Sequence, residues 1–282
     1  MEVILAESAG FCYGVKRALD TVAEAAKAHG KPMFTLGPLI HNPQVVEKLE
    51  SQGVKSVKGL GEVPAGSIVV MPSHGVPRAV LEQAKASGIE IIDLTCPFVN
   101  KVQELAGGLV KEGYQVVVLG DAGHTEVQAI MSRAGEDAIA VCGAEDLANY
   151  ALKNRVGILA QTTQTVERYE RLVAKVASLA YEMRAYNTIC NATTDRQNAA
   201  VDVARAVDVM IVVGGRNSAN TRRLAEICAE TGVLTHHVEV ADEINPEWFA
   251  GARKVGVTAG ASTPDWIIEE VIRKLKEIPP AA

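Results

Sequence analysis

The chain has 282 residues, of which 48% are hydrophobic and 22% charged, and a formal net charge of −6. This length allows two domains or three small ones, and the negative charge argues against a protein that binds nucleic acid through a basic surface. Residues 1–10 lack the basic start and long apolar run of a signal peptide, and no apolar stretch is long enough to cross a bilayer, so we expect a cytoplasmic protein with no membrane or nucleic-acid partner.

Along the chain, the same strand–turn–helix pattern occurs three times at domain-sized intervals. An apolar strand is followed by a polar turn with a glycine and then by a helix, beginning at Met33, Gln115 and Val209. A second strand–turn–helix pattern follows each of these, beginning at Ser67, Arg155 and Arg253. Such repetition predicts βα units, and hence a small, mainly parallel sheet flanked by helices in each repeat.

We therefore predict an α/β fold with three domains that span residues 13–95, 96–189 and 190–282. The apolar segment at residues 3–6 has no place in the first repeat, so we expect the strand within residues 1–12 to complete the third domain. If the three domains pack around a pseudo-threefold axis, the polar turns at the carboxyl ends of their strands face a central cavity.

Three of the five cysteines share one context. Cys12, Cys96 and Cys190 each follow an extended or turn-like stretch and precede a helix, and a turn glycine comes 24 or 25 residues later. An odd number of cysteines in a reducing compartment argues against a disulfide framework. Three thiolates without the short Cys pairs of a zinc site suit a [4Fe–4S] cluster with one iron left open to substrate. Cys142 and Cys228 lie outside this context, and we assign them to packing.

The polar turns supply a candidate acid and candidate anion-binding groups. His41, His74 and His124 lie in three of these turns, and Glu126 follows His124 by two residues. A carboxyl group in a closed anionic cavity has a raised pKa, so Glu126 is a candidate proton donor, although an acid in the first turn of a helix also stabilises the helix dipole. Hydroxyl and amide groups beside helix starts either cap those helices or bind an anion; they belong to Thr162, Thr163, Ser218, Asn220 and Ser262.

At these residues the sequence resembles the 4-hydroxy-3-methylbut-2-enyl diphosphate reductase family over nearly the whole chain. The matching motifs are GFCYGVKRA, HN at 41–42, SHGV at 73–76, DLTCP, GHTEV, QTTQ, NATTDRQ, NSAN and TAGAS. The resemblance implies a trefoil of three α/β domains around a [4Fe–4S] cluster, one iron of which can be lost on oxidation to give [3Fe–4S]. The sequence departs from the family at Ala219, where many members carry serine.

The resemblance implies a role for each matching residue. Cys12, Cys96 and Cys190 are implied to ligate the cluster, and Glu126 to be the proton source. Thr163 and His124 are also implied to be catalytic, with Thr163 near the substrate hydroxyl. The implied substrate-binding set is His41, His74, His124, Thr163, Ser218, Asn220 and Ser262. The implied reaction is reductive dehydroxylation of 4-hydroxy-3-methylbut-2-enyl diphosphate to isopentenyl and dimethylallyl diphosphate, the last step of the methylerythritol phosphate route to isoprenoid precursors.

The resemblance also implies a ferredoxin or flavodoxin as electron donor, and the sequence has neither a P-loop nor a G-x-G-x-x-G dinucleotide motif. Two other interpretations stay open. One is a lyase like quinolinate synthase, which has a [4Fe–4S] cluster. Its dicarboxylate substrate should favour turn residues other than those found in this sequence. The other is a non-enzymatic iron–sulfur sensor, which would have little need for Glu126 or for converging polar turns.

Overall fold

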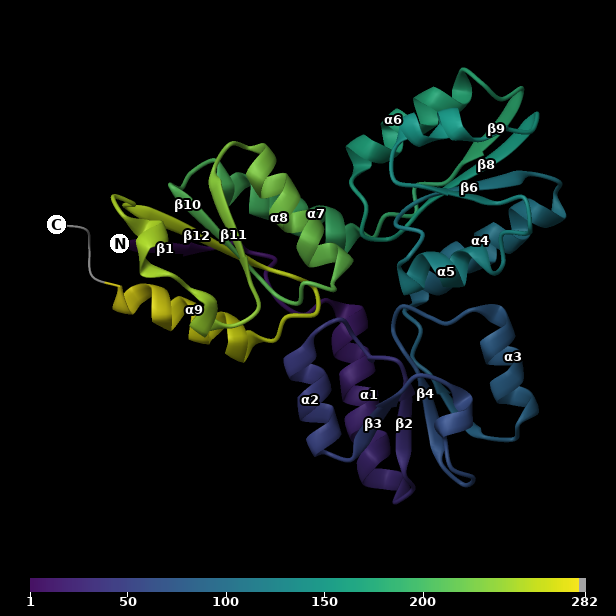
Figure 1. The fold of residues 1–282 in the computed structure, drawn as a ribbon, viewed down its shortest axis with the longest axis horizontal. Helices are drawn as coiled ribbons and strands as arrows, with labels where there is room; N and C mark the ends of the chain where they lie inside the picture. Colours follow the sequence, from purple (N-terminus) through teal and green to yellow (C-terminus); the bar gives the residue numbers. More distant parts are fainter. Residues whose placement is uncertain (279–282) are drawn as a thin grey trace. The chain divides into compact units, whose positions relative to one another are not determined.

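The computed structural model describes residues 1–278, and these residues form three four-stranded sheets with helices packed on them (Figure 1). Every strand pairing in the three sheets is parallel. The predicted α/β class, with three small parallel sheets, is confirmed. Residues 279–282, which close the third predicted domain, lie outside the described part of the chain.

The first sheet has the strand order β3-β2-β4-β5. Its strands are β2 (Met33–Leu36), β3 (Val54–Val57), β4 (Ile68–Met71) and β5 (Glu90–Asp93). The connecting elements are α2 (Pro43–Ser51), the short 3-10 helix η1 (Leu60–Glu62) and α3 (Arg78–Ala86). Alternate residues of the central strands face α3, where Val69 and Met71 pack with Ala84 in one apolar cluster.

The second sheet repeats this order as β7-β6-β8-β9. Its strands are β6 (Gln115–Leu119), β7 (Ile139–Val141), β8 (Arg155–Ala160) and β9 (Glu182–Ala185). The connecting elements are α5 (Thr125–Met131), η2 (Ala144–Asn149) and α6 (Val166–Ala177). The same strand order in two successive segments is the structural counterpart of the repeat in the sequence.

The third sheet has the order β11-β10-β12-β1, so its outer strand comes from the other end of the chain. Its strands are β10 (Val209–Val213), β11 (Leu234–Val238), β12 (Lys254–Ala259) and β1 (Glu2–Leu5). The connecting elements are α8 (Ala219–Glu230), η3 (Ala241–Glu243) and η4 (Pro246–Phe249), and α9 (Asp265–Glu277) follows the last strand, β12. The pairing of β1 with β12 gives this sheet the strand that β5 and β9 provide in the other two.

A helix begins directly after each cysteine of the repeated context. These helices are α1 (Tyr13–His29), α4 (Pro97–Lys111) and α7 (Asn191–Ala204), which follow Cys12, Cys96 and Cys190. Helix α4 packs on β6 and β8, and α7 packs on β12 and α8. Strands β1, β5 and β9 are therefore each joined, through a cysteine, to α1, α4 and α7, respectively.

The chain divides into two compact units, and the three sheets are distributed unequally between them. The larger unit comprises residues 17–40 and 48–190 and holds the first and second sheets. The smaller unit comprises residues 1–16, 41–47 and the chain from 191 onward, and holds the third sheet. The segment 41–47 thus belongs with the third sheet, although it lies between strands of the first. The three domain boundaries given by the sequence remain predictions.

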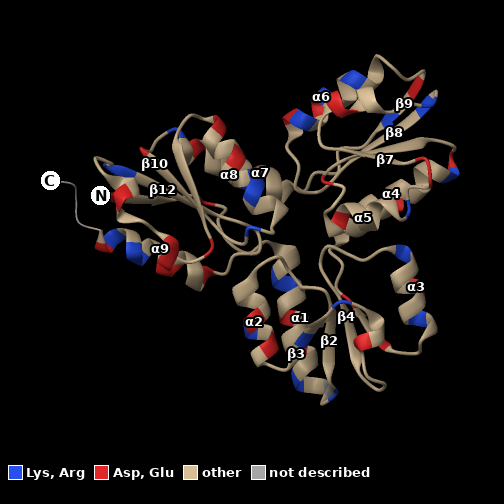
Figure 2. Cartoon of the chain, in the orientation of Figure 1, with Lys and Arg blue, Asp and Glu red and all other residues tan. Residues whose placement is uncertain are grey.

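Alternation along the central strands builds an apolar layer on both faces of each sheet. In β6, Val116 and Val118 pack with residues of α4 and α5, whereas Val117 and Leu119 pack with residues of α6. The β10 strand shows the same alternation between α7 and α8 on one face and α9 on the other. Charged residues lie mainly on the helices and at strand ends, as Figure 2 shows. Burial on both faces explains why the sequence shows continuous apolar runs.

Gly157 in β8 allows α4 to pack unusually close to the second sheet. A Cβ atom at Gly157 would lie 2.6 Å from Cδ1 of Leu109. We expect Gly157→Ala to lower the free energy of unfolding by about 1–3 kcal/mol, because Leu109 must leave its place. Gly108→Ala is the matched control: it lies on α4 with no atom within 4 Å of the added Cβ, and should raise stability by about 0.5–1 kcal/mol. Urea denaturation of both variants tests this; equal effects would contradict the close packing.

Candidate functional site

The three cysteines of the repeated context make the same backbone contact. Each cysteine amide donates a hydrogen bond to the carbonyl of the second residue after a central strand. These bonds are Cys96 N to Ser73 O (2.9 Å), Cys190 N to Thr162 O (3.0 Å) and Cys12 N to Ala261 O (3.1 Å). The acceptors follow β4, β8 and β12. The cysteines are therefore equivalent in geometry as well as in sequence context, each tied to a turn at the carboxyl end of a parallel strand.

The chemistry of these cysteines fits an iron–sulfur cluster. All three are half-buried, none is in a disulfide, and each stands directly before a helix. Soft thiolate ligands select iron–sulfur clusters, zinc or copper(I). Cys96 and Cys190 belong to the larger unit and Cys12 to the smaller one. Among residues 1–278, no three His, Cys, Asp or Glu side chains are gathered as a metal site, so the fit rests on the donors themselves.

The other two cysteines differ from each other. Cys228 is fully buried among the apolar residues between α7, α8 and β10, and burial raises the pKa of its thiol to about 12. Its assignment to packing is confirmed. Cys142 is exposed, so its assignment to packing was wrong. It follows β7, an outer strand, and its backbone amide donates to Asp146 Oδ2 (2.8 Å), which places it in a surface turn.

Glu126 is a buried carboxyl group held by a single neighbour. Its Oε1 accepts a hydrogen bond from Thr162 N (2.7 Å) and its Oε2 accepts one from Thr162 Oγ1 (3.0 Å). Only 3% of Glu126 is exposed, and burial raises its pKa to about 7, although the two bonds from Thr162 act against that rise. Glu126 is thus able to hold a proton near neutral pH, as a general acid must.

His124 begins the same helix and is oriented by it. The ring is buried, and its Nδ1 accepts a hydrogen bond from Glu126 N (3.1 Å), which caps α5. An Nδ1 that accepts leaves the proton of the neutral ring on Nε2. The capping contact therefore presents an N–H donor at Nε2, on a residue two positions before the buried acid.

His74 lies in the turn after β4, and the backbone of this turn approaches α4 closely. Its Nδ1 is 3.0 Å from Gly75 O and its Nε2 is 3.3 Å from Pro38 O, and burial lowers the pKa of the ring. Gly75 has a φ of +77°, and a Cβ there would lie 2.7 Å from Nε2 of Gln103. The glycine lets this turn pack against α4 beside Thr95, the residue before Cys96.

In the smaller unit, Ser218, Asn220 and Ser262 follow the carboxyl ends of β10 and β12, and His41 lies on the segment 41–47. Ser218 caps α8, its Oγ accepting a hydrogen bond from Thr221 N (3.3 Å). Asn220 is 5% exposed, and neither polar atom of its side chain has a hydrogen-bond partner among residues 1–278. Ser262 Oγ donates to His41 O (3.2 Å), so the segment 41–47 is tied to the turn after β12. A buried amide without a partner at a helix start is suited to an anionic ligand.

The sequence reasoning did not single out Thr162 among the helix-start residues, yet Thr162 contacts two of the candidate site residues. It donates to Glu126 through N and Oγ1 and accepts from Cys190 through O. Thr163, the predicted catalytic residue, is half-buried on the same turn. The motif QTTQ marked the turn, but the choice between its two threonines required knowledge that β6 and β8 are neighbours.

The raised pKa of Glu126 predicts a pH-dependent contribution to stability. The folded chain keeps a proton on Glu126 up to about pH 7, whereas an unfolded glutamate loses it near 4.5. Stability should therefore fall as pH rises from about 4.5 to 7, by up to about 3 kcal/mol. Glu126→Gln, which mimics the protonated form, should be more stable than the wild type at pH 8 and equal to it at pH 4. Urea denaturation at both values tests this, and parallel pH curves would contradict it.

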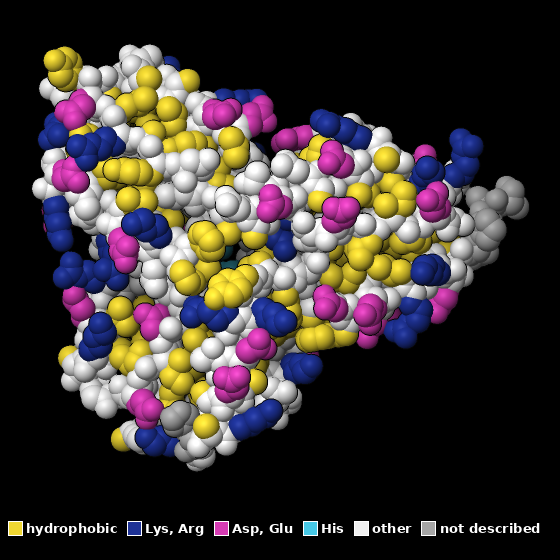
Figure 3. All heavy atoms as spheres, turned by 180° about the vertical axis from the view of Figure 1, so that it is seen from behind, with side chains coloured by type: hydrophobic (Ala, Val, Ile, Leu, Met, Phe, Trp, Pro, Cys, Tyr) yellow, Lys and Arg dark blue, Asp and Glu magenta, His cyan; other side chains and the backbone are white. Residues whose placement is uncertain are grey.

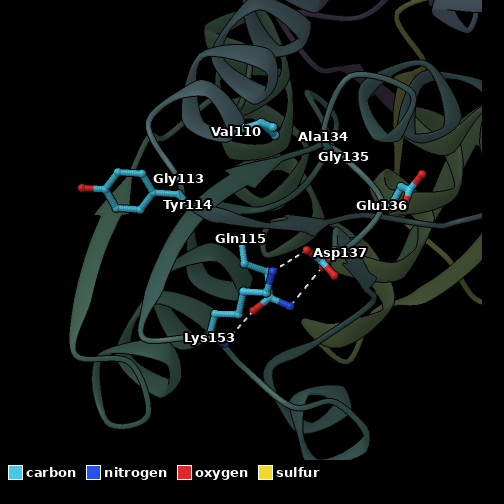
Figure 4. Close-up of a pocket in the computed structure, with 9 residues that line it drawn as sticks. All are labelled: Val110, Gly113, Tyr114, Gln115, Ala134, Gly135, Glu136, Asp137 and Lys153. Carbon is cyan, nitrogen blue, oxygen red and sulfur yellow. Dashed lines mark hydrogen bonds and ion pairs between the residues drawn. The ribbon is translucent and has the colours of Figure 1, made fainter.

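A separate cavity of about 200 Å³ lies at the opposite edge of the second sheet (Figure 4). It opens beside Gln115, the first residue of β6, and not at the carboxyl ends of the strands. Three of its polar side chains contact one another or the backbone: Gln115 Nε2 donates to Asp137 O (3.0 Å), Gln115 Oε1 accepts from Lys153 N (2.8 Å), and Lys153 forms an ion pair with Asp137. These contacts explain the cavity as a local feature of the fold.

One face of the described molecule is drawn in Figure 3 with its charged side chains coloured. On the face drawn in Figure 3, Lys and Arg side chains lie among Asp and Glu side chains. No helix among residues 1–278 combines the length and the apolar character that a membrane span needs.

Comparison with known proteins identifies relatives along the whole length of this chain. A family model described as LytB protein matches residues 3–276. The chain is 52% identical to a protein of Geobacter metallireducens over 99% of this chain and 98% of the relative, and 51% identical to one of Pelobacter propionicus over 99% of each. Both relatives are named 4-hydroxy-3-methylbut-2-enyl diphosphate reductase.

Two solved structures are also similar. One is described as (E)-4-hydroxy-3-methyl-but-2-enyl diphosphate reductase, the terminal enzyme of the non-mevalonate pathway; it is 44% identical, with a TM-score of 0.71 over 99% of this chain and 100% of that one. The other is the E-1-hydroxy-2-methyl-but-2-enyl-4-diphosphate reductase of Plasmodium falciparum, 28% identical, with a TM-score of 0.93 over 99% of this chain and 89% of that one.

Proposed function

This chain belongs to the LytB protein family, and on that premise we propose that it is a cytoplasmic oxidoreductase that converts 4-hydroxy-3-methylbut-2-enyl diphosphate to isopentenyl and dimethylallyl diphosphate. The names of its relatives support the substrate and the reductive step in isoprenoid precursor biosynthesis. The family match favours this function over a quinolinate synthase-like lyase or a non-enzymatic sensor.

One observation carries the proposal. Thr162 is hydrogen-bonded both to the buried acid Glu126 and to the backbone amide of Cys190. A proton donor with a pKa of about 7 is thus fixed to the turn that fixes a thiol. Reductive loss of a hydroxyl group needs both functions in one place, because an electron source alone cannot release hydroxide as water near neutral pH.

Cys12, Cys96 and Cys190 are the residues proposed to hold a [4Fe–4S] cluster, which can lose one iron on oxidation to give [3Fe–4S]. When bound by three thiolates, the cluster supplies single electrons and a Lewis-acidic iron without a protein ligand. The absence of a dinucleotide motif supports a ferredoxin or flavodoxin as the electron donor.

The side chains have separate tasks in the proposed reaction. Overall, the allylic alcohol takes up two electrons and two protons, its C–O bond breaks, a C–H bond forms, and water leaves. Glu126 holds the proton that the departing hydroxyl group takes, and the hydroxyl group of Thr163 orients the substrate oxygen. His124, with its proton on Nε2, is proposed to donate to the diphosphate.

The remaining polar turn residues are proposed to bind the diphosphate group. They are His41, His74, Ser218, Asn220 and Ser262. Asn220 supports this most directly, because its buried amide has no hydrogen-bond partner within the described part of the chain. Several helix starts with hydroxyl and amide groups form an anion site that needs no basic surface.

The proposal is tested by purifying the protein without oxygen, measuring its iron and sulfide, and then adding the hydroxylated allylic diphosphate with a low-potential reductant. We expect about four irons per chain and formation of both five-carbon diphosphates. A protein that carries the cluster but leaves this substrate unchanged would contradict the proposed reaction. Formation of product by the iron-free protein would contradict the proposed cofactor.

A further inference from the structure

Two arginine side chains contact the backbone just before two of the cysteines. Arg17 on α1 donates from Nη2 to Leu94 O and to Thr95 O, both at 3.0 Å. Arg196 on α7 donates from Nη2 to Gly10 O at 2.8 Å, and it is only 4% exposed. The carbonyl groups that Arg17 contacts lie two residues and one residue before Cys96, and the carbonyl group that Arg196 contacts lies two residues before Cys12.

The arrangement follows the repeat. Each arginine lies on a helix that begins directly after one cysteine of the set, and it contacts the segment that leads to another. Arg17 comes five residues after Cys12, and Arg196 comes six residues after Cys190. Because two arginines on corresponding helices make corresponding backbone contacts, the contacts are a repeated feature of the fold.

The third approach segment shows that the fold does not require an arginine there. Before Cys190, the hydroxyl group of Thr188 donates to Ala160 O (2.6 Å) and accepts from Ala160 N (2.8 Å). Asn187 Oδ1 accepts from Ile189 N, as Asp93 Oδ1 accepts from Thr95 N before Cys96. Uncharged contacts therefore suffice to shape such a segment. Burying a guanidinium group costs free energy because the charge loses its hydration. We therefore ask what the positive charge at these positions does.

The backbone at each of these two cysteines makes two hydrogen bonds, one that accepts from an arginine and one that the cysteine amide donates to a turn. Thr95 O, which accepts from Arg17, belongs to the peptide group whose N–H is that of Cys96, and this N–H donates to Ser73 O. Gly10 O accepts from Arg196, while Cys12 N donates to Ala261 O. Hydrogen bonds thus hold the backbone around both cysteines, and a guanidinium group contacts the backbone one or two residues before Cys96 and two residues before Cys12.

We propose that Arg17 and Arg196 are positioning residues of the cluster site, which fix the segments leading to Cys96 and Cys12 and raise the reduction potential of the bound cluster. The inference rests on the proposed function. A cluster bound by three thiolates gains negative charge on reduction, so fixed cations nearby stabilise the reduced form. Groups beyond the ligands that orient them typically change metal affinity by 10–100-fold.

The test compares Arg17→Met, Arg17→Lys, Arg196→Met and Arg196→Lys with the wild type, all loaded with cluster. Three quantities are measured: the rate of iron release to a chelator, the reduction potential by a redox titration followed by electron paramagnetic resonance, and the unfolding temperature of the iron-free protein. Arg171→Met is the matched control, because Arg171 is an exposed arginine on α6 paired with Glu167.

We expect the two Met variants to release iron about 10–100-fold faster and to have a lower reduction potential. The Lys variants keep the charge but lose the fork of donors, so they should release iron faster while keeping a potential closer to that of the wild type. Arg171→Met should match the wild type in both measurements. The Lys variants keep the test decisive if a Met variant does not fold.

Met variants with a lowered unfolding temperature but with the iron release and potential of the wild type would overturn the inference, because the arginines would then be only structural. A wild type that holds the cluster without reducing the allylic diphosphate would contradict the proposed function, while a faster iron release and a lower potential in the Met variants would still support the role of the arginines. A wild type that forms no cluster would overturn both.

Discussion

Replacing Glu126 with Gln is expected to lower the turnover number about 10²–10⁴-fold while the iron and sulfide content stays that of the wild type. Gln has the shape of the protonated acid: its Oε1 can accept from Thr162 N, and its amide group can donate to Thr162 Oγ1, where Glu126 makes bonds of 2.7 and 3.0 Å. The packing and the turn that fixes Cys190 are preserved, and only the transferable proton is lost.

The wild type should also show a characteristic pH dependence. Burial keeps the pKa of Glu126 at about 7, so the proton-donating form dominates below that value and disappears above it. The turnover number should therefore fall as pH rises through about 7, and Glu126→Gln should lack this fall. Thr162→Val removes the hydrogen bond from Oγ1, which favours the charged form, and should move the fall to higher pH.

Glu167→Gln is the matched control for both measurements. Glu126 and Glu167 each lie in the first turn of a helix, in α5 and α6, but Glu167 is exposed and pairs with Arg171. If Glu126 acts only on the helix dipole, the two substitutions should have similarly small effects. A Glu126→Gln variant that turns over at the wild-type rate would remove Glu126 from the catalytic set.

The fold was accessible from the sequence because its determinants are local. Apolar runs such as Val116–Leu119, followed by a polar turn and a helix, specify a buried parallel strand wherever they occur. Three such series predicted three parallel sheets, and the unplaced segment at residues 3–6 corresponds to β1, which pairs with β12.

Features that depend on which elements are neighbours were not accessible. Glu126 and Thr162 are 36 residues apart, and they meet only because β6 pairs with β8. Arg17 contacts Leu94, which is 77 residues away in the chain, and no sequence motif predicts this contact. Cys142 was assigned to packing because it lies outside the repeat, but position relative to a repeat does not determine exposure. The unit to which residues 41–47 belong was also not evident.

Serine substitution at Cys12, Cys96 or Cys190 should reduce the iron content of protein purified without oxygen at least tenfold and abolish measurable turnover. Serine is nearly isosteric with cysteine, but its hard oxygen is a poor ligand where a soft thiolate is required. The backbone contacts from the cysteine amides to Ser73, Thr162 and Ala261 do not involve the side chain, so the turns should remain in place.

Two substitutions at the remaining cysteines separate ligation from packing. Cys142→Ser changes an exposed thiol and should keep both the cluster and the activity. Cys228→Ala removes a fully buried sulfur from the cluster of apolar residues around α7 and α8, and should cost about 1–2 kcal/mol of stability without loss of iron. Iron analysis together with thermal unfolding distinguishes these outcomes.

The comparison among the three serine variants is the most demanding part of this test. Their cysteines share a helix start and the same amide contact to the second residue after a strand, so a common role predicts equal losses of iron. If one thiol were only a packing residue, its serine variant would retain the iron and fall in stability, as Cys228→Ala should. Retention of a full complement of iron by any one of the three would therefore exclude that cysteine as a ligand, and with it the open iron position that the proposed reduction requires.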